Sequence, residues 1–206
     1  MDLHYLLLGV TALILGYLLG SFPSGYLAGK WLANIDLREI GSGSTGTTNV
    51  LRNVGKKAAI TVFLIDVSKG VFAVLLAKLF NLQDTWQVIA GLFALIGHIW
   101  PIWLQWKGGK AVATGLGLFL GLSWPVGLAC LGVFLVVIYF SKTVSLASVL
   151  AALGLPILMF FSFQPNEISY PYLSISIISM ILVLWRHRSN VKRLIQGIEP
   201  KIGDKH

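Results

Sequence analysis

The sequence is poor in cysteine, in charge and above all in acidic residues. Its one cysteine, Cys130, lies inside an apolar run, which excludes a secreted scaffold held by disulfides. Only 12% of its 206 residues are charged, whereas 56% are hydrophobic, and the mean hydropathy is +0.79. Soluble domains carry about 25% charged residues, so an ordinary soluble enzyme and a disordered chain are both excluded. The composition indicates an integral membrane protein.

Patterns that bind metals are also missing from the sequence. It has 8 Asp and Glu and 4 His, without an HExxH motif or a Cys/His zinc spacing. The carboxylates are too few for a typical magnesium site. We therefore expect no metal and no cofactor, and a chemistry that relies on positioning and electrostatics.

Long apolar runs, in contrast, are abundant. A hydrocarbon core about 30 Å thick needs about 20 helical residues. Residues 3–22 fit this length and lack a basic segment before them, so they predict a membrane helix rather than a signal peptide. Residues 111–122 are too short to span alone, and whether they cross completely stays open. The other runs are residues 58–80, 86–104, 125–140, 144–163 and 172–185.

The basic residues indicate how many of these runs cross the membrane. With seven crossings, every lysine and arginine except Lys69 and Lys78 falls on one side, whereas six crossings would place Lys142 and the basic tail on the wrong side. Because basic residues are retained in the cytoplasm, the pattern predicts an all-α polytopic membrane protein with seven transmembrane helices. Its amino terminus is expected outside and its carboxyl terminus in the cytoplasm. No repeat is apparent, so we expect a single membrane-embedded domain over residues 1–206.

The first polar motif, residues 41–49, lies in the longest polar connection, residues 23–57. It combines three glycines with five hydroxyl side chains and an amide, and Arg52 follows it. Glycine lets backbone N–H groups converge on an anion, and hydroxyls and a guanidinium add donors, which predicts phosphate binding. Its match to GxGxxG carries no weight, because no strand precedes it. A flexible, solvated loop is the alternative.

The second motif joins residues 97–101 to residues 107–115. Lys107 and Lys110 flank a glycine pair before a predicted helix, which offers cations, free backbone donors and the positive end of a helix dipole. A membrane anchor with a tight turn is the alternative. His98 fits either a direct role or a satisfied buried histidine.

The third motif, residues 186–193, opens a short basic amphipathic helix predicted over residues 186–196 and ending at Gly197. His187 and Asn190 are three residues apart and share a face of that helix. A histidine there can donate, accept or bind an anion. A basic tail that faces lipid phosphates is the alternative.

One pair of charges lies inside a predicted membrane helix. Asp66 and Lys69 are three residues apart, and ionisable groups at that depth face the interior of a helix bundle. They either form a structural pair or line a polar cavity.

In these three segments the chain resembles the bacterial acyl-phosphate:glycerol-3-phosphate acyltransferase family (PlsY). The family carries segments like GSGNxGATNxxR, GHxxPxFxxFKGGKxVAT and RHxxNxxR, which are matched in order by residues 41–52, 97–114 and 186–193. The resemblance covers essentially the whole chain. The departures are Ser44 and Thr47 for Asn and Ala, Trp103 and Trp106 for phenylalanines, and Ser189 for an acidic residue.

The resemblance implies transfer of a fatty acyl group from acyl-phosphate to the 1-hydroxyl of sn-glycerol 3-phosphate, which gives lysophosphatidic acid and phosphate for phospholipid biosynthesis. It implies a multi-pass protein of the bacterial plasma (inner) membrane with an active site that faces the cytoplasm. Membrane lipids would surround the protein, and neither a nucleic acid nor an obligatory protein partner is expected.

The resemblance also implies roles for individual residues. Ser42, Asn49 and Arg52 would hold the acyl-phosphate head, and His187 and Asn190 would orient the acceptor. The implied catalytic residues are Ser42, Arg52, His187 and Asn190, and the implied substrate-binding residues are Gly41, Gly43, Thr48, Asn49, Lys107, Gly108, Gly109, Lys110 and His98. Direct attack on the activated donor is expected, with His187 or a donor phosphate oxygen as base. An acyl-Ser42 intermediate is the competing mechanism.

Two other classes of protein fit the same features less well. A transporter of phosphate or organic anions would use the basic loops and the buried Asp66 and Lys69, but the polar motifs cluster on one side and no repeat is seen. A lipid-head-group binding protein would not need two glycine-rich loops.

Overall fold

The computed structural model describes residues 2–163 and 169–204, and this part of the chain contains helices and connecting loops but no β-strand. The predicted all-α class is therefore confirmed. The chain divides into two compact units, Met1–Leu122 and Ser123–His206. A single domain over the whole length stays a prediction.

Within the described residues, five helical segments are long and apolar enough to cross a membrane. They are Leu3–Ala33, Lys56–Leu79, Asp84–Leu104, Trp124–Ser141 and Val144–Phe161. Val112–Leu122 and Tyr170–Arg186 are apolar but shorter. The first segment continues to Ala33, beyond the end of the predicted run at residue 22, so part of the predicted polar connection is helical. The other segments coincide with the predicted apolar runs, and the short run before Ser123 is short in the structure too. The number of crossings and the side of each terminus stay predictions.

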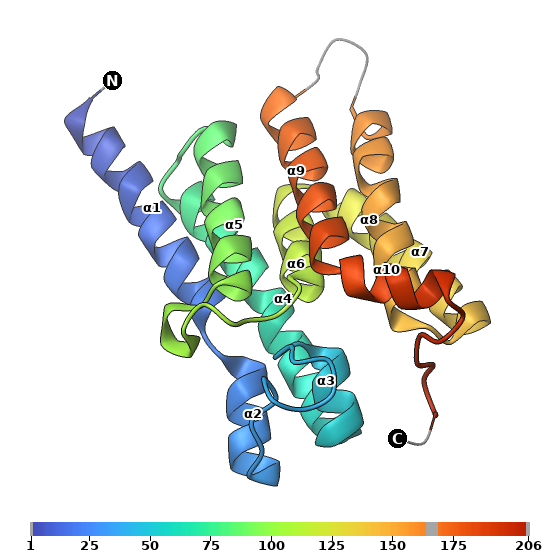
Figure 1. Ribbon diagram of the computed structural model, residues 1–206. Helices are drawn as coiled ribbons and strands as arrows, with labels where there is room; N and C mark the ends of the chain where they lie inside the picture. The colour runs from blue at the N-terminus through green and yellow to red at the C-terminus, as the bar shows by residue number, and fades with distance from the viewer. Residues whose placement is uncertain (1, 164–168, 205–206) are drawn as a thin grey trace. The chain divides into compact units, whose positions relative to one another are not determined.

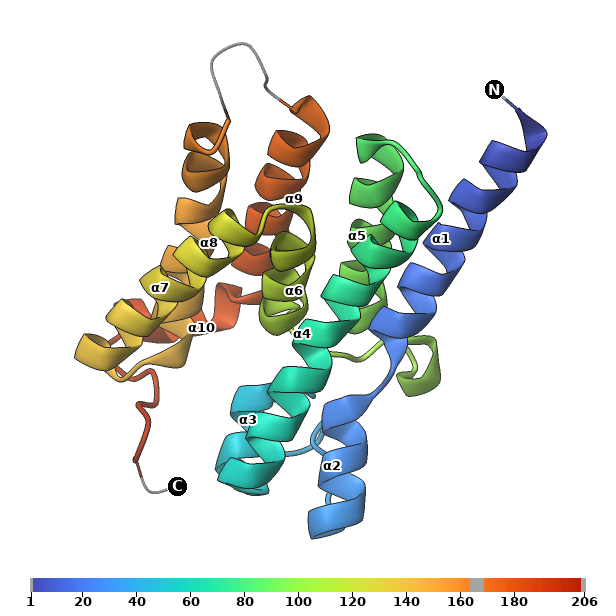
Figure 2. The same cartoon turned by 180° about the vertical axis from the view of Figure 1, so that it is seen from behind.

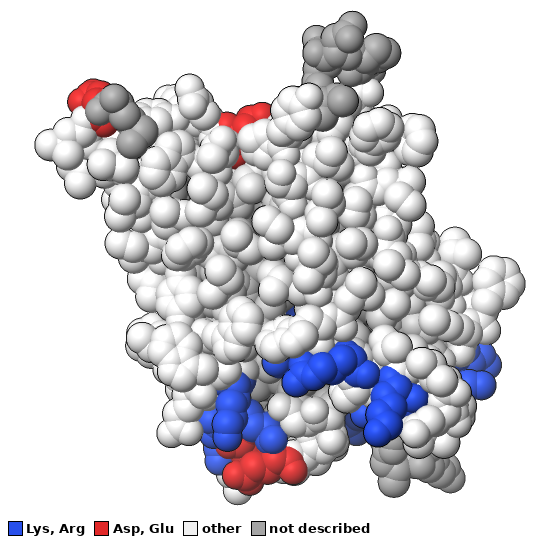
Figure 3. Space-filling model, turned by 45° about the horizontal axis from the view of Figure 1, so that its top comes forward, with Lys and Arg blue, Asp and Glu red and all other residues white. Residues whose placement is uncertain are grey.

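The surface fits a membrane environment. Large apolar side chains are exposed on many helices, among them Leu79, Tyr139 and Phe140, each more than 70% accessible. In Figure 3, lysine, arginine, aspartate and glutamate cover only a small part of the visible surface, and uncharged residues cover the rest. Lipid solvates such a surface favourably, whereas water does not.

The first unit is built on four helices that lie side by side (Figures 1 and 2): α1 (Leu3–Ser21), α4 (Lys56–Leu79), α5 (Asp84–Ile99) and α6 (Val112–Leu122). Helix α1 packs on α5 and α4, and α4 packs on α6. Glycines allow these close contacts, since a Cβ at Gly16 would collide with the Ala90 carbonyl and one at Gly117 with the Val67 carbonyl. Small residues at helix contacts are typical of membrane proteins.

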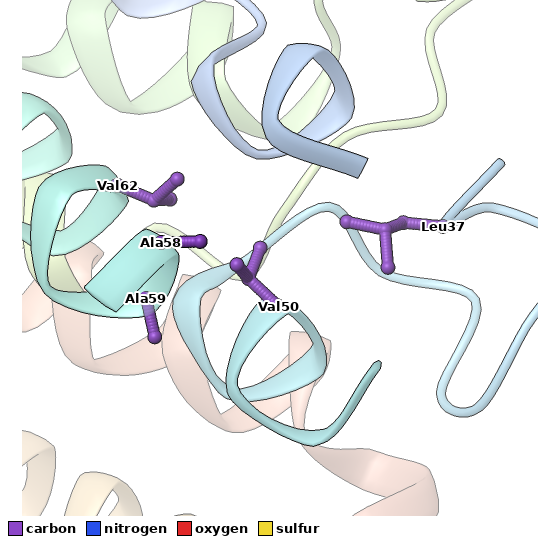
Figure 4. Close-up of a cluster of buried hydrophobic side chains, with 5 residues drawn as sticks. All are labelled: Leu37, Val50, Ala58, Ala59 and Val62. Atoms are coloured by element: carbon purple, nitrogen blue, oxygen red, sulfur yellow. The ribbon is translucent and has the colours of Figure 1, made fainter. Parts of the chain in front are cut away.

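Three short helices complete the first unit: α2 (Ser24–Ala33), α3 (Thr47–Asn53) and the 3-10 helix η1 (Ile102–Leu104). Pro23 separates α1 from α2, because proline disfavours the helical conformation of the residue before it. Phe22 indeed leaves the helical region, with φ −56° and ψ 120°. The loop between α2 and α3 is fixed by a buried apolar cluster shown in Figure 4, which comprises Leu37, Val50, Ala58, Ala59 and Val62.

The second unit contains α7 (Trp124–Ser141), α8 (Val144–Phe161), α9 (Tyr170–Arg186) and α10 (Arg188–Ile195). Helix α8 packs on both α7 and α9. The predicted basic helix over residues 186–196 is present as α10, but it begins two residues later, because His187 (φ −99°, ψ 6°) interrupts the helical backbone. Gly197 follows it in the left-handed region, with φ 71°.

Candidate functional site

The first motif is organised around one buried amide. Asn49, at the start of α3, is only 2% exposed. Its side-chain oxygen accepts from the Ser42 N–H and from Asn53 Nδ2. Its Nδ2 donates to three carbonyl oxygens at 2.9–3.0 Å, those of Leu37, Ile40 and Ser44. In this structure Asn49 therefore holds the loop in shape, whereas the resemblance implied that it binds the acyl-phosphate head.

Two glycines allow the loop to turn around Asn49. Gly41 and Gly43 have φ of 62° and 65°, a region that side chains disfavour, and a Cβ at Gly41 would meet Asn49 Oδ1. The exposed Ser42 lies between them. The Ser42 N–H donates to Asn49, and the Gly43 N–H donates to the Ile40 carbonyl. These two N–H groups are therefore used within the loop, and the loop presents the exposed Ser42 side chain.

Helix α3 carries the next two predicted residues of this motif. Thr48 and Arg52 are both half-buried and lie four residues apart, so they share one face of the short helix. The hydroxyl and the guanidinium therefore lie on the same side of α3.

An ion pair that the sequence did not reveal lies just before the first motif. The Arg38 guanidinium donates to Asp36 at 2.7 Å, and it also donates to the Leu104 carbonyl at 3.4 Å and covers the Tyr26 ring. The hydrogen bonds from Arg38 lower the pKa of Asp36 to about 2, so this carboxylate is ionised throughout the physiological range. The pair fastens the loop before Ser42 to the segment that precedes Lys107.

The second motif is held by backbone pairing. The Gly108 N–H donates to the Ile99 carbonyl at 3.1 Å, and the Gly109 N–H donates to the His98 carbonyl at 3.0 Å. The prediction that this glycine pair offers free backbone donors is therefore wrong. Helix α6 begins only at Val112, so the pair does not stand at the helix start either. What the motif presents is the exposed Lys107 and the half-buried Lys110.

A hollow of about 190 Å³, including its opening to solvent, lies where α1 gives way to α2. Thr45 of the first motif and His98 of the second both line it, together with Lys69 of α4. The hydroxyl-bearing Ser21 and Ser24 contribute to its wall. The first two motifs therefore meet at one polar cavity within the first unit.

Asp66 and Lys69 form the structural pair that their spacing allowed. Lys69 Nζ donates to Asp66 Oδ1, and the carboxylate is 1% exposed. Because Lys69 also lines the hollow, the alternative of a polar cavity is met as well.

In the second unit, His187 is 3% exposed and its Nδ1 lies 2.8 Å from the Val183 carbonyl oxygen. A carbonyl only accepts, so Nδ1 carries a hydrogen, and the neutral ring then has Nε2 as its basic nitrogen. The hydrogen bond to the Val183 carbonyl thus fixes the tautomer of the ring.

Glu199 is a residue of this unit that sequence reasoning missed. It is buried and accepts from Asn190 Nδ2 at 2.6 Å, from Arg193 Nε at 2.6 Å and from Ser145 Oγ at 2.8 Å. Burial opposes its ionisation, but these three donors outweigh the burial and the pKa of Glu199 is lowered. Its position as an isolated glutamate in a basic tail is the signal by which the sequence could have revealed it. It fixes the Asn190 side chain.

This arrangement predicts a pH-dependent stability. The lowered pKa of Glu199 means that its stabilising effect is complete above its ordinary pKa and is lost as the pH falls through the folded-state value. We expect Glu199→Gln to lower the melting temperature in detergent at about pH 7, because Arg193 and Asn190 lose their anionic partner. The difference from the unmodified protein should shrink only as the pH falls below 4.5, the ordinary pKa of glutamate, toward the lower folded-state value.

The matched control is Asp204→Asn. Asp204 is a carboxylate of the same tail, but it is exposed and accepts only the Lys201 N–H among the hydrogen bonds found for the described residues. Its replacement should leave the melting curve nearly unchanged. Equal effects of the two substitutions at every pH would contradict a specific role for Glu199.

Comparisons of this sequence with family models and with known proteins lead to the same family. The glycerol-3-phosphate acyltransferase family matches residues 10–197. The glycerol-3-phosphate acyltransferase of Prochlorococcus marinus (strain NATL2A) is 63% identical over 196 residues, which cover 95% of this chain and 99% of that protein. The enzyme of the same name from Synechococcus sp. (strain CC9902) is 64% identical over 200 residues, 97% and 98% of the two chains.

Solved structures agree with this match. A crystal structure of PlsY (YgiH), an integral membrane glycerol 3-phosphate acyltransferase in its glycerol 3-phosphate form, has a TM-score of 0.88 and 36% identity, over 95% of this chain and 96% of that one. The lysophosphatidic acid form of PlsY (YgiH) has a TM-score of 0.83 and 34% identity, over 95% of each chain.

Proposed function

This chain belongs to the glycerol-3-phosphate acyltransferase family, and we propose that it transfers a fatty acyl group from acyl-phosphate to the 1-hydroxyl of sn-glycerol 3-phosphate. The products are lysophosphatidic acid and inorganic phosphate, and the reaction belongs to phospholipid biosynthesis. The acyl-phosphate donor rests on the resemblance of the three motifs. We also propose seven crossings of a bacterial plasma (inner) membrane, with the active site facing the cytoplasm.

One observation carries the proposal more than any other. Thr45 of the first motif and His98 of the second line the same hollow, and Lys69 adds an ammonium group to its wall. The exposed Ser42 and Lys107 belong to the same two motifs. The Lys69 ammonium is itself bonded to Asp66, Ser24 and the Phe22 carbonyl, so the hollow marks where the two motifs meet. The exposed side chains of the same two motifs would bind the phosphorylated substrates there.

Because the N–H groups of Ser42, Gly43, Gly108 and Gly109 are used within the protein, phosphate binding has to rely mainly on side chains. We propose that Ser42 and Arg52 bind the acyl-phosphate head and that Lys107 and Lys110 bind glycerol 3-phosphate. Gly41, Gly43, Thr48, Asn49, Gly108, Gly109 and His98 would support them by shaping the two loops.

The donor is already an activated mixed anhydride, so a covalent acyl-enzyme is not required. The acceptor hydroxyl attacks the acyl carbonyl carbon, a new ester C–O bond forms, and the C–O bond to phosphate breaks. Arg52 and the lysines would stabilise the carbonyl oxyanion and the departing phosphate. His187 Nε2 would take the proton of the hydroxyl, and Asn190, held by Glu199, would orient the acceptor.

The first test is an assay of the purified protein in detergent with palmitoyl-phosphate, with and without glycerol 3-phosphate. We expect phosphate release that depends on the acceptor and that equals the lysophosphatidic acid formed. Arg52→Ala serves as the inactive control. Equal turnover with acyl-CoA would contradict the proposed donor, and no product from folded protein would favour anion transport, which flux into vesicles would reveal.

A further inference from the structure

Four buried polar side chains from three helices form one cluster in the first unit. They are Ser24 of α2, Asp66 and Lys69 of α4, and His98 of α5, none more than 7% exposed. Ser24 Oγ donates to Asp66 Oδ1 at 2.6 Å, and Lys69 Nζ donates to the same oxygen. Lys69 Nζ also donates to the Phe22 carbonyl at 2.7 Å. One carboxylate oxygen is therefore the point where the donors of α2 and α4 meet.

His98 lies next to this oxygen. Its Nδ1 is 3.8 Å from Asp66 Oδ1, beyond hydrogen-bond distance, so the carboxylate acts on the ring through its charge. Both side chains are buried, and charges in buried positions are screened less than charges at the surface. Asp66 thus balances Lys69 and, at the same time, faces the imidazole.

The far edge of the same ring touches the second motif. A Cβ placed on Gly109 would collide with Nε2, Cδ2 and Cε1 of His98, so the Gly109 backbone rests directly on the imidazole. The Gly109 N–H donates to the His98 carbonyl as well. The position of Gly109 is therefore set twice by His98, once through the main chain and once through the ring.

From these contacts we propose that Asp66 is a positioning residue for the binding of glycerol 3-phosphate. It holds the His98 ring between α4 and Gly109, and the ring holds the segment that carries Lys107 and Lys110. This inference rests on the proposed function, which assigns those two lysines to the acceptor. A pair that merely joined α4 to α2 would not need a histidine between the carboxylate and the glycine motif.

The test is Asp66→Asn, which keeps the shape of the side chain but removes its charge. Lys69 then faces His98 without its counter-charge, and the contact between the ring and Gly109 is disturbed. We expect KM for glycerol 3-phosphate to rise about 10- to 100-fold, while KM for palmitoyl-phosphate changes little. The control is Lys78→Met on the same helix, whose ammonium donates to the Gly121 carbonyl away from the motifs and whose loss should leave both KM values unchanged.

A double substitution separates positioning from plain structural support. Gly109→Ala should raise KM for glycerol 3-phosphate by itself, because its methyl group displaces the ring. The double variant with Asp66→Asn and Gly109→Ala should then have the same KM for glycerol 3-phosphate as Gly109→Ala alone, since both substitutions act through His98. Additive effects, or equal losses for both substrates with a lower melting temperature, would overturn the proposal.

Two further arms keep the outcome decisive. Where Asp66→Asn does not fold, Ser24→Ala removes one of the donors to the same oxygen. It should also raise KM for glycerol 3-phosphate and leave KM for palmitoyl-phosphate unchanged, but the rise should be smaller. Calorimetric titration with glycerol 3-phosphate alone gives a readout without turnover. A protein that binds it but forms no product contradicts the proposed reaction, and a weakened affinity of Asp66→Asn still supports positioning. A protein that binds none overturns both.

Discussion

Replacing His187 by glutamine is expected to lower kcat for acyl transfer by more than about 100-fold, while KM for glycerol 3-phosphate stays within a few-fold of the original. Glutamine fills a similar volume and can donate to the Val183 carbonyl in the place of Nδ1, but it cannot take a proton. The loss therefore falls on the chemical step. Steady-state rates of lysophosphatidic acid formation, measured at saturating palmitoyl-phosphate, give kcat and KM separately.

The neighbouring Arg188 supplies the control. It is exposed, and its guanidinium covers the Trp185 ring and donates to the Trp185 carbonyl. Arg188→Gln should keep kcat near that of the unmodified enzyme. If His187→Gln instead keeps its kcat and shows only a raised KM, the histidine binds the acceptor and a phosphate oxygen of the donor is the base.

The second large effect is expected at Asn49. Asn49→Asp keeps the shape of the side chain but removes the donors to the Leu37, Ile40 and Ser44 carbonyls and brings a negative charge against them. Each buried acceptor that loses its partner costs about 1–3 kcal/mol, so the loop around Ser42 should lose its fixed shape. We expect acyl transfer to fall at least about 100-fold, because a displacement of about 1 Å is enough for a loss of that size.

Limited proteolysis measures the loop directly. Cleavage within residues 34–46 should become much faster in Asn49→Asp, before the rest of the first unit is cut. Asn53→Ala is the matched control, since Asn53 donates only to the Asn49 carbonyl and side-chain oxygens among the described contacts, and it should show a far smaller change. Slow cleavage together with lost activity would mean that Asn49 contacts the substrate itself.

The helices were largely predictable because a helix that crosses a membrane needs a long apolar run, which is visible in the sequence. Residues 58–80 were expected to span, and α4 covers Lys56–Leu79. The first run was also expected to end at residue 22, and α1 ends at Ser21, just before Pro23. The short run before Ser123 was recognised by its length. In each case the determining interactions lie within a few residues of one another.

The parts of the site that depend on distant contacts were not predictable. Backbone pairing of His98 and Ile99 with Gly109 and Gly108 depends on the fold, and no local pattern shows that these N–H groups are occupied. Glu199 lies 54 residues from Ser145, which it contacts, and outside every motif. Asn49 belonged to the first motif, but its burial depends on the folded shape of the loop around it, which no local pattern shows.

The bond from Lys69 to the Phe22 carbonyl has a consequence for how the protein is made. It joins residues 47 positions apart, so it forms only after α4 has emerged from the ribosome. A nascent chain that ends before Lys69 holds α1 and α2 without the ammonium group that ties their junction to the rest of the first unit. The break between the first two helices is therefore set early and locally by Pro23, and its tie to α4 follows only when Lys69 is in place.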